Sequence, residues 1–424
     1  MLIRLPFGKE EVEFEVPDEN ILAILKPSGL APKVNLTSLT INALSRPIGL
    51  PPLSDLASKG AKVLIVIDDY TRKTPTRALL PHIIRELRKG GIRESDITIL
   101  MALGTHRPPS EKEVEYKIGK EIRDRYAVLF HNWKDDTQMI KLGKVDGKVI
   151  VKVNKAVKEA DLILGLGMII PHRVSGYSGG GKIIQPGISG SEITGYTHWM
   201  SAKFPSEEIL GVFDNPVKRC IDLIAEEAGL KFLVNLVLDG RGNVIDVFAG
   251  DFREVHRKGS FLAKRVYGVK VPGKADIVIA DCPPPTDIDM WQAAKSLYAA
   301  SLAVKPGGTI VLLAACPEGI SKEHPEVEEM GYRPYDEIKC LLEKGEVTDL
   351  IAASHMVHVG EIIRRKARCI LISKGIGRGL AEHVGFEYAS NIEEALELAI
   401  KRHGSRAKII VLREAPSLIP IVKA

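Results

Sequence analysis

Residues 62–89 read KVLIVIDDYTRKTPTRALLPHIIRELRK and contain one complete β–α unit. The run from Lys62 to Ile67 is rich in β-branched residues, which is typical of a strand buried on both faces of a sheet. An amphipathic helix is expected from about Thr76 to Lys89, with Thr74 as its N-cap and Pro75 at its first helical position. Because this pattern recurs along the chain, it sets the expected fold class.

The connection inside this unit carries Asp69 and Arg72, where α/β proteins commonly place ligand-binding residues. The alternative is a capped turn with a local Asp–Arg pair. A second unit repeats the layout, because a strand from Asp96 to Leu103 runs into a loop with His106, and residues 110–113 (SEKE) open a helix with a capping box. A lone histidine at a strand end is often structural, but the repeated layout favours a functional one.

Repeated β–α units predict an α/β fold with mostly parallel sheets and right-handed crossovers. We expect an N-terminal cofactor-binding domain over residues 1–272, ending in a bridging helix near residues 251–266. A C-terminal α/β domain is expected over residues 273–424, and its tail, residues 416–422, forms either a last strand there or a segment returning to the first domain. The active site is expected in the cleft between the two domains.

Composition excludes several classes of protein. The 424 residues carry a formal net charge of +5, without a basic run interleaved with aromatics, which argues against nucleic-acid binding. No signal peptide and no apolar run of about 18 residues is present, so we expect a cytoplasmic protein that makes no membrane contact. Few glutamines beside many Lys, Arg and Glu indicate a thermophilic source. The cysteines contain no zinc-binding pair and fit a reducing compartment: Cys220, Cys282, Cys316, Cys340 and Cys369.

A glycine-rich turn follows the apolar segment Leu162–Ile170, within residues 168–200, which read MIIPHRVSGYSGGGKIIQPGISGSEITGYTHWM. It matches neither a Walker nor a Rossmann motif, and a plain structural loop is the alternative interpretation. Lys182 at its end could neutralise a phosphate or bond covalently to a cofactor. The turn itself could cradle that phosphate through Ser178, Gly179, Gly180 and Gly181.

Three histidines of the first domain lie at strand ends or in loops: His106, His172 and His198. Gln292 and Lys295 in the second domain are three residues apart and share one helix face. The histidines could bind a metal ion together, or divide into one ligand and two acid/base groups. The residues alone leave both options open.

The ordered set of motifs resembles the lactate racemase family, which are nickel-pincer-nucleotide racemases and epimerases of 2-hydroxy acids. The resemblance covers nearly the whole chain, and the spacings from His172 to Lys182 and from Lys182 to His198 match the family pattern. Each motif alone is weak, whereas the set in this order is strong. The motifs are Asp69-Tyr70-Thr71-Arg72, Gly104-Thr105-His106, Pro171-His172, Gly179-Gly180-Gly181-Lys182, Thr197-His198 and Gln292-Ala293-Ala294-Lys295.

The resemblance implies a cofactor site. Lys182 would hold a pyridinium mononucleotide through a covalent thioamide, and two sulfur arms and a ring carbon of that group would bind Ni(II). His198 would be the fourth nickel ligand, in a square-planar centre. The phosphate would lie on the glycine-rich turn, while Asp69 orients a neighbour and Arg72 contacts the cofactor or the substrate.

The resemblance also implies the reaction. His106 and His172 would be the two acid/base residues, one for the hydroxyl of each enantiomer. The Cα–H of a 2-hydroxy carboxylate is too weak an acid for a histidine to remove readily, so a transient hydride transfer through a 2-keto acid is expected. Arg72, Gln292 and Lys295 would hold the substrate carboxylate or the cofactor.

One region departs from the family. His355 and His358 lie where aromatic residues can contact substrate, so the pocket would be more polar there and a sugar acid becomes a candidate beside lactate. The alternative is two surface histidines on a helix. Trp291, next to Gln292, would wall the pocket or only pack.

Two other functions are considered: a zinc-dependent hydrolase built on the three histidines, and a non-catalytic two-lobed protein that binds a sugar acid or nucleotide. The family interpretation implies further partners, namely proteins that make the cofactor and insert nickel. It also implies that the chain expressed alone lacks the cofactor and is inactive.

Overall fold

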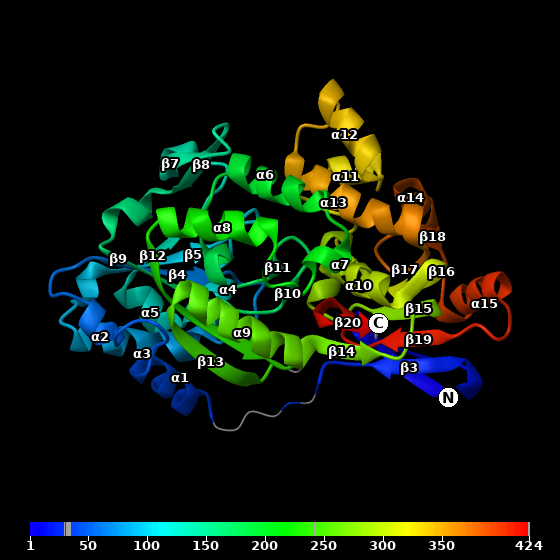
Figure 1. Cartoon of the computed structure of the whole chain (residues 1–424), viewed down its shortest axis with the longest axis horizontal. Coiled ribbons are helices and arrows are strands. Elements are labelled where there is room, and N and C mark those ends of the chain that lie inside the picture. Colours follow the sequence, from blue (N-terminus) through cyan, green and yellow to red (C-terminus); the bar gives the residue numbers. More distant parts are fainter. Residues whose placement is uncertain (29, 31–34, 241, 423–424) are drawn as a thin grey trace. The chain divides into compact units, whose positions relative to one another are not determined.

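The computed structural model describes residues 1–28, 30, 35–240 and 242–422. The chain divides into two compact units. Unit 1 contains residues 1–28, 198–212 and 264–424, and unit 2 contains residues 29–197 and 213–263. Both are mixed α/β units with mostly parallel sheets, as the repeated β–α pattern predicted (Figure 1).

Unit 2 is built on a six-stranded sheet in the order β13-β12-β9-β4-β5-β6. All neighbours are parallel except β12 and β13, which are antiparallel. The central strands are apolar and buried along their whole length, because helices cover both faces. The strands are β4 (Val63–Asp68), β5 (Ile97–Ala102), β6 (Ala127–Phe130), β9 (Leu162–Met168), β12 (Leu230–Leu238) and β13 (Val244–Asp251).

Helices α1 and α3 lie on one face of this sheet, and α8 and α9 lie on the other (Figure 1). Helix α3 has the predicted bounds, Thr76–Lys89, but its N-cap is Pro75, one residue later than predicted. Thr74 instead donates its hydroxyl to Asp68. The helices of unit 2 are α1 (Leu36–Ser45), α2 (Leu53–Leu56), α3, α4 (Glu111–Ile118), α5 (Lys120–Arg125) and α8 (Pro216–Glu227), with most of α6 (Ser191–Ala202) and α9 (Phe252–Tyr267).

Two hairpins complete unit 2. The first consists of β7 (Met139–Val145) and β8 (Val149–Asn154). A two-residue pair, β10 (Pro171–His172) and β11 (Gly176–Tyr177), follows β9 and precedes a short 3-10 helix, η5 (Gly180–Ile183).

Unit 1 has a fully parallel six-stranded sheet in the order β18-β17-β16-β15-β19-β3. An N-terminal hairpin, β1 (Leu2–Phe7) with β2 (Glu10–Glu15), packs its apolar side chains with those of α15 against one face. The strands are β3 (Ile21–Leu25), β15 (Ala275–Asp281), β16 (Val304–Leu313), β17 (Arg368–Ile372), β18 (Glu387–Tyr388) and β19 (Ile409–Leu412), with the separate pair β14 (Gly268–Val271) and β20 (Ile419–Val422).

The helices of unit 1 include α10, which follows β15 and carries Trp291, Gln292 and Lys295. The helix that carries His355 and His358 begins at Leu350 and continues after Gly360 as a π-helix over Glu361–Lys366. The helices are α7 (Ser206–Ile209), α10 (Met290–Ala303), α11 (Glu326–Met330), α12 (Tyr335–Lys344), α13 (Leu350–Gly360), α14 (Arg378–Val384) and α15 (Ile392–His403).

The observed division of the chain differs from the expected one at residue 272. Residues 1–28 belong to unit 1, because β3 pairs with β19 at the edge of its sheet. Residues 198–212 and the end of α9, from Lys264, also belong to unit 1. The tail pairs with β14 inside unit 1, so it forms a last strand there rather than returning to unit 2.

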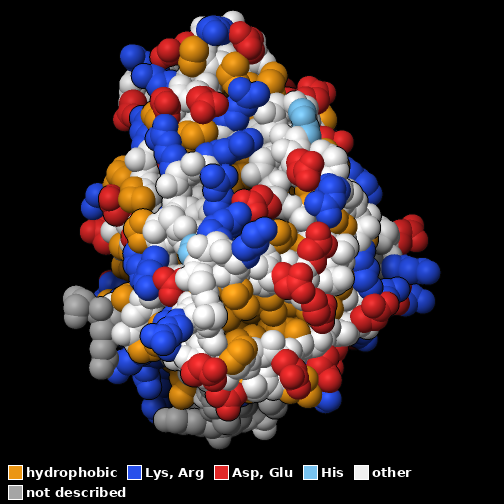
Figure 2. All heavy atoms as spheres, turned by 90° about the vertical axis from the view of Figure 1, so that its right-hand side faces the viewer, with side chains coloured by type: hydrophobic (Ala, Val, Ile, Leu, Met, Phe, Trp, Pro, Cys, Tyr) orange, Lys and Arg blue, Asp and Glu red, His pale blue; other side chains and the backbone are white. Residues whose placement is uncertain are grey.

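In the described part of the chain, no helix is long and apolar enough to cross a membrane. Figure 2 shows the face that carries the β1–β2 hairpin and α15, where lysine, arginine and acidic side chains are interspersed. No large field of one sign covers this face, in keeping with the small net charge.

Candidate active site

The candidate residues of unit 2 gather at one edge of its sheet. Strands β4, β5 and β6 follow one another to one side of β4, whereas β9 lies on the other side. The strand order therefore reverses between β4 and β9, and ligands of open α/β sheets bind outside the carboxyl ends of strands at such a point. The loop after β4 carries Asp69 and Arg72, and the loop after β5 carries His106. The segment after β9 carries His172 and Lys182.

Asp69 and His106 form a close pair. The Nδ1 of His106 lies 2.6 Å from Oδ2 of Asp69. Burial would raise the pKa of Asp69, but the charge and hydrogen bond of His106, the Arg72 guanidinium and the Thr71 hydroxyl together lower it well below its usual value. A carboxylate only accepts, so His106 donates its Nδ1–H and its neutral ring keeps the lone pair on Nε2.

A buried lysine anchors the loop that presents this pair. The Nζ of Lys117, on α4, lies 2.7 Å from Oδ1 of Asp68 and donates to the carbonyl oxygen of Arg72 at 3.0 Å. Asp68 also accepts from Thr74. These contacts hold both ends of the Asp69–Arg72 turn. The Lys117 ammonium and the Asp68 carboxylate are both largely buried, so each stabilises the charge of the other.

His172 has the opposite tautomer. Its Nδ1 accepts the backbone N–H of Val174 at 3.2 Å, so the neutral ring carries its proton on Nε2. The ring lies on the short β10–β11 hairpin, and the hydroxyl of Ser175 is 3.5 Å from the same Nδ1. The two candidate acid/base histidines are thus held in different protonation patterns by their neighbours.

The glycines of the turn are required by packing inside the protein. A Cβ at Gly179 would lie 2.5 Å from Oδ1 of Asn235, and a Cβ at Gly180 would lie 2.5 Å from the ring of His256. Both glycines have positive φ, and the N–H of Gly180 donates to Asn235 at 2.9 Å. The Ser178 hydroxyl donates to the carbonyl of Met168. A phosphate cradle at this turn stays a prediction, with these two donors already used.

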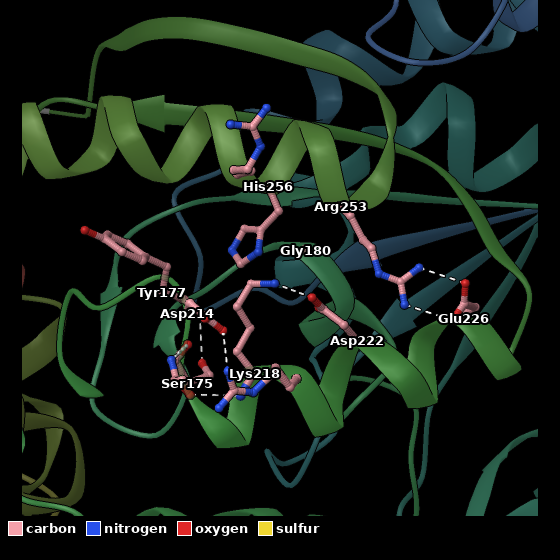
Figure 3. A network of polar contacts seen from close by, with 12 residues as sticks. Ser175, Tyr177, Gly180, Asp214, Lys218, Asp222, Glu226, Arg253 and His256 are labelled. Atoms are coloured by element: carbon pink, nitrogen blue, oxygen red, sulfur yellow. Dashed lines mark hydrogen bonds and ion pairs between the residues drawn. The ribbon is translucent and has the colours of Figure 1, made fainter. Parts of the chain in front are cut away.

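His256 is a residue that the sequence analysis missed. Its ring lies over Gly180 (Figure 3), and its Nε2 donates to the carbonyl of Ser178 at 3.0 Å. Burial, followed by the charges of Lys218 and Lys182, lowers its pKa to about 3, although the bond to Ser178 opposes this. The ring is therefore neutral at pH 7. A single histidine in the middle of a helix gives no signal in the sequence.

A buried ion pair lies beside this ring. Lys218 and Asp222, both on α8, form an ion pair (Figure 3). The Lys218 ammonium also lies 4.4 Å from the ring centroid of Phe213. Lys182 interacts electrostatically with the same histidine, because its charge helps to lower the pKa of His256. Lys182 itself is half-buried on η5, where its N–H donates to Gly179.

His198, the predicted nickel ligand, lies half-buried on α6, in the segment that belongs to unit 1. Its carbonyl accepts from Ser201 at 2.6 Å. Among the described residues, no three His, Cys, Asp or Glu side chains gather in a way that could hold a metal ion. A metal ion bound to His198 would therefore need further ligands other than His, Cys, Asp and Glu side chains of the described residues.

In unit 1, Gln292 and Lys295 lie together on α10 as predicted, and Lys295 donates to Oε1 of Gln292 at 2.5 Å. The loop after β15 leads into this helix, and the Asp289 side chain caps it by accepting the N–H of Gln292. Strand order also reverses beside β15, between it and β19, so this helix starts at the ligand-binding edge of its own sheet.

Trp291 is stacked between two histidines. Its ring centroid lies 4.3 Å from that of His324 and 4.1 Å from that of His355. His324 in turn places its Nδ1 2.6 Å from Oδ2 of Asp349. Trp291 is half-buried, so one part of its surface stays accessible.

His355 and His358 are both buried, so the alternative of two surface histidines is wrong. The helix that carries them is covered by α10 and by residues of α6. Tyr298 lies 3.3 Å from Nδ1 of His355, and Ser201 lies 3.0 Å from Nε2 of His358. Burial, with the charges of His324 and His198, lowers the pKa of His355 to about 3, which makes this ring neutral.

These observations describe a two-unit α/β protein with two candidate acid/base histidines on loops that follow strands of one sheet. Two family models match the chain: the lactate racemase N-terminal domain over residues 7–209 and the lactate racemase C-terminal domain over residues 271–420. The chain belongs to the lactate racemase family and is therefore an isomerase of the racemase type.

Characterised relatives support the same assignment. A lactate racemase of Thermoanaerobacterium thermosaccharolyticum is 32% identical over 321 residues, which cover 75% of each chain. A lactate racemase of Lactiplantibacillus plantarum is 28% identical over 427 residues, 98% of this chain and 99% of the relative.

Solved structures agree with the fold. The lactate racemase apoprotein from T. thermosaccharolyticum matches with a TM-score of 0.89 and 29% identity over the full length of both chains. A Thermotoga maritima protein matches with a TM-score of 0.71 and 22% identity over 88% of this chain and 96% of its own, which supports the fold alone.

Proposed function

We propose that this chain inverts C2 of a 2-hydroxy carboxylate, with lactate or a sugar acid as substrate. The observation that carries the proposal is that the Asp69–His106 pair and His172 lie on the loops that follow β4, β5 and β9, three consecutive strands of one sheet. Membership of the lactate racemase family supports it.

The two histidines perform the proton transfers in this proposal. His106 accepts the hydroxyl proton on Nε2, and Asp69 stabilises the imidazolium that results. His172, starting as an imidazolium, gives its Nε2 proton to the oxygen on the opposite face and becomes the neutral ring whose Nδ1 accepts the N–H of Val174. The roles exchange when the other enantiomer enters, which accounts for two histidines.

The cofactor is proposed to be a nickel-pincer nucleotide, attached covalently to Lys182, with His198 as the protein ligand to nickel. When bound, this group supplies a reversible acceptor for the Cα hydride. The donor set fits it, because the described residues offer no cluster of three protein ligands and a pincer group brings its own sulfur and carbon donors. Lys182 supplies the amine, and the bonds around η5 hold its backbone in place.

Substrate binding is proposed for Arg72, and also for Gln292 and Lys295. A guanidinium or ammonium group is needed to hold the carboxylate while the hydrogen at C2 moves. Trp291 and His355 are proposed as a wall of the substrate pocket, and the neutral His355 ring makes that wall polar. This polarity is the reason for keeping a polyhydroxy acid beside lactate.

The test is co-expression with the proteins that make the cofactor and insert nickel, the partners proposed for this chain. We expect a mass adduct on Lys182, nickel equimolar with the chain, and interconversion of D- and L-lactate or of an aldonate pair by chiral chromatography. Lys182→Ala should lose all three. Zinc without an adduct, together with ester hydrolysis, would instead support a hydrolase and contradict the proposal.

A further inference from the structure

A groove of about 700 Å³ lies in unit 2, lined by α3, the end of α4 and α5. It is separate from the loops that carry Asp69, His106 and Lys182. One carboxylate, that of Glu121, lines it, against six cations: Arg77, Arg85, Arg88, Lys89, Lys120 and Arg125. For a chain whose formal net charge is +5 over 424 residues, this is a strong local excess of positive charge.

Half of these cations have carboxylate partners. Arg88 pairs with Glu94 at 3.0 Å, Lys89 with Glu86 at 2.8 Å, and Arg125 with Glu121 at 2.9 Å. The other three, Arg77, Arg85 and Lys120, have no carboxylate partner among the described residues, and the polar neighbour of Arg85 is the ring of His82. Three cationic groups are thus available to a ligand.

The spacing on α3 shows that the arrangement has a cost. Arg77, Pro81, Arg85 and Lys89 follow one another at intervals of four residues, so they form one stripe along the helix. Like charges at this spacing destabilise a helix by a few tenths of a kcal/mol per pair, and Arg88 adds a further charge beside the stripe. Folding alone does not require this pattern, whereas an anionic ligand would be stabilised by it.

The floor of the groove is apolar. Ile84, Ile118, Ile122 and Tyr126 are buried beneath the cations. Small-molecule sites commonly have volumes of about 300–1,000 Å³, an apolar lining and a few converging polar groups. Arginine is suited to phosphate because its planar fork binds two oxygens at once. The combination matches an organic phosphate that also carries a flat apolar ring.

We propose that this groove binds a nucleoside-diphosphate-sized organic phosphate, with the phosphates on Arg77, Arg85 and Lys120 and the ring on the apolar floor. An acidic polypeptide is the weaker candidate, because a protein interface buries far more surface than a concave groove of this volume offers. The site is independent of the cofactor attachment proposed at Lys182, which lies on another element.

The test is calorimetric titration of the full chain with ADP at low salt, beside pyrophosphate and adenosine as its two halves. We expect ADP to bind at least about tenfold more tightly than either half, since each half loses one set of contacts. The double variant Arg77→Gln/Lys120→Gln should weaken ADP binding at least about tenfold, because two charge-assisted contacts are lost. Both side chains are exposed, so the variant should keep its thermal midpoint.

Two controls make the result decisive. Lys148→Gln removes an exposed lysine from the β7–β8 turn and should leave ADP binding within about twofold, because this residue does not line the groove. Lys182→Ala should also leave it unchanged. The proposal is overturned if ADP does not bind, if the double variant binds it equally well, if pyrophosphate binds as tightly as ADP, or if Lys182→Ala abolishes binding.

Discussion

The two units each contain a histidine–aspartate pair of the same geometry, with Nδ1 2.6 Å from Oδ2, but the exposure of the partners is reversed. In unit 2, the His106 side chain is 26% exposed and Asp69 is 5% exposed. In unit 1, the His324 side chain is 3% exposed and Asp349 is 24% exposed. The accessible partner is the histidine in one pair and the carboxylate in the other.

The second interactions of each carboxylate explain the difference. Asp69 also accepts from Thr71 and orients an accessible imidazole. Asp349 caps α13, since its Oδ1 accepts the N–H groups of Ile351 and Ala352, while His324 is covered by Trp291. Geometry alone therefore does not identify a catalytic pair. The ring must also present its second nitrogen to a ligand.

The largest difference is expected for the accessible histidine. His106→Ala should lower kcat by about 10²–10⁴, the usual contribution of a positioned acid/base group. Its stability to urea should change little, because the side chain is partly exposed. The rates of lactate interconversion are compared with those of His82→Ala, a control at another partly exposed histidine of unit 2, which should keep the parent rate. An equal rate loss in both variants would remove His106 from the mechanism.

Removing the charge of Asp69 should have a smaller effect. Asp69→Asn keeps the size of the side chain but weakens a charge-assisted hydrogen bond worth about 1.5–3 kcal/mol, so kcat should fall about 10–100-fold. The rate is measured with the unfolding midpoint on the same sample. A variant that loses stability but keeps kcat would place Asp69 with Asp349 as a structural carboxylate.

Acid should destabilise both units through their buried neutral histidines. The pKa values of His256 and His355 are about 3 in the folded protein, against an ordinary value of 6.5. Between these values the unfolded chain binds more protons than the folded protein. Lowering the pH from about 6.5 to 5 should therefore reduce the free energy of unfolding by about 2 kcal/mol per histidine. Urea unfolding of the parent and of His355→Gln is measured at both pH values. The decrease in the free energy of unfolding between them should be about 2 kcal/mol smaller for His355→Gln than for the parent. An equal loss contradicts the assignment.

The smallest effect on the rate is expected for the carboxylate of unit 1. Asp349→Ala removes the N-cap of α13, worth about 1 kcal/mol, and the charge-assisted bond to His324, worth about 1.5–3 kcal/mol. It should therefore lower the free energy of unfolding but change kcat less than twofold. Chemical unfolding and rate measurements on one preparation test this. A rate loss as large as that of Asp69→Asn would show that the two pairs have similar roles.

The pattern of β–α units was predicted well from the sequence. The bounds of α3 match, because strong apolar periodicity with polar flanks leaves little choice. The capping box at Ser110 is present, since it depends only on residues three apart. The loops that follow the buried strands also carry the predicted candidates.

Features that depend on tertiary packing were not predictable. The burial of His355, the ring of His256 against Gly180 and the pairing of β3 with β19 join residues far apart in the sequence. The N-cap of α3 was misplaced because Thr74 bonds to Asp68 instead, a competing contact that local propensity does not include. Local rules therefore found the positions of the candidates but not their neighbours.

The pairing of β3 with β19 also affects how the chain is completed during synthesis. Ile21 pairs with Ile409, so the edge strand of unit 1 emerges from the ribosome almost the whole chain before its partner. Unit 2 has all of its residues by Ala263 and can fold while the rest is still being made. The N-terminal segment must wait, with its apolar strand unpaired, which makes nascent chains halted before residue 409 the species most exposed to aggregation.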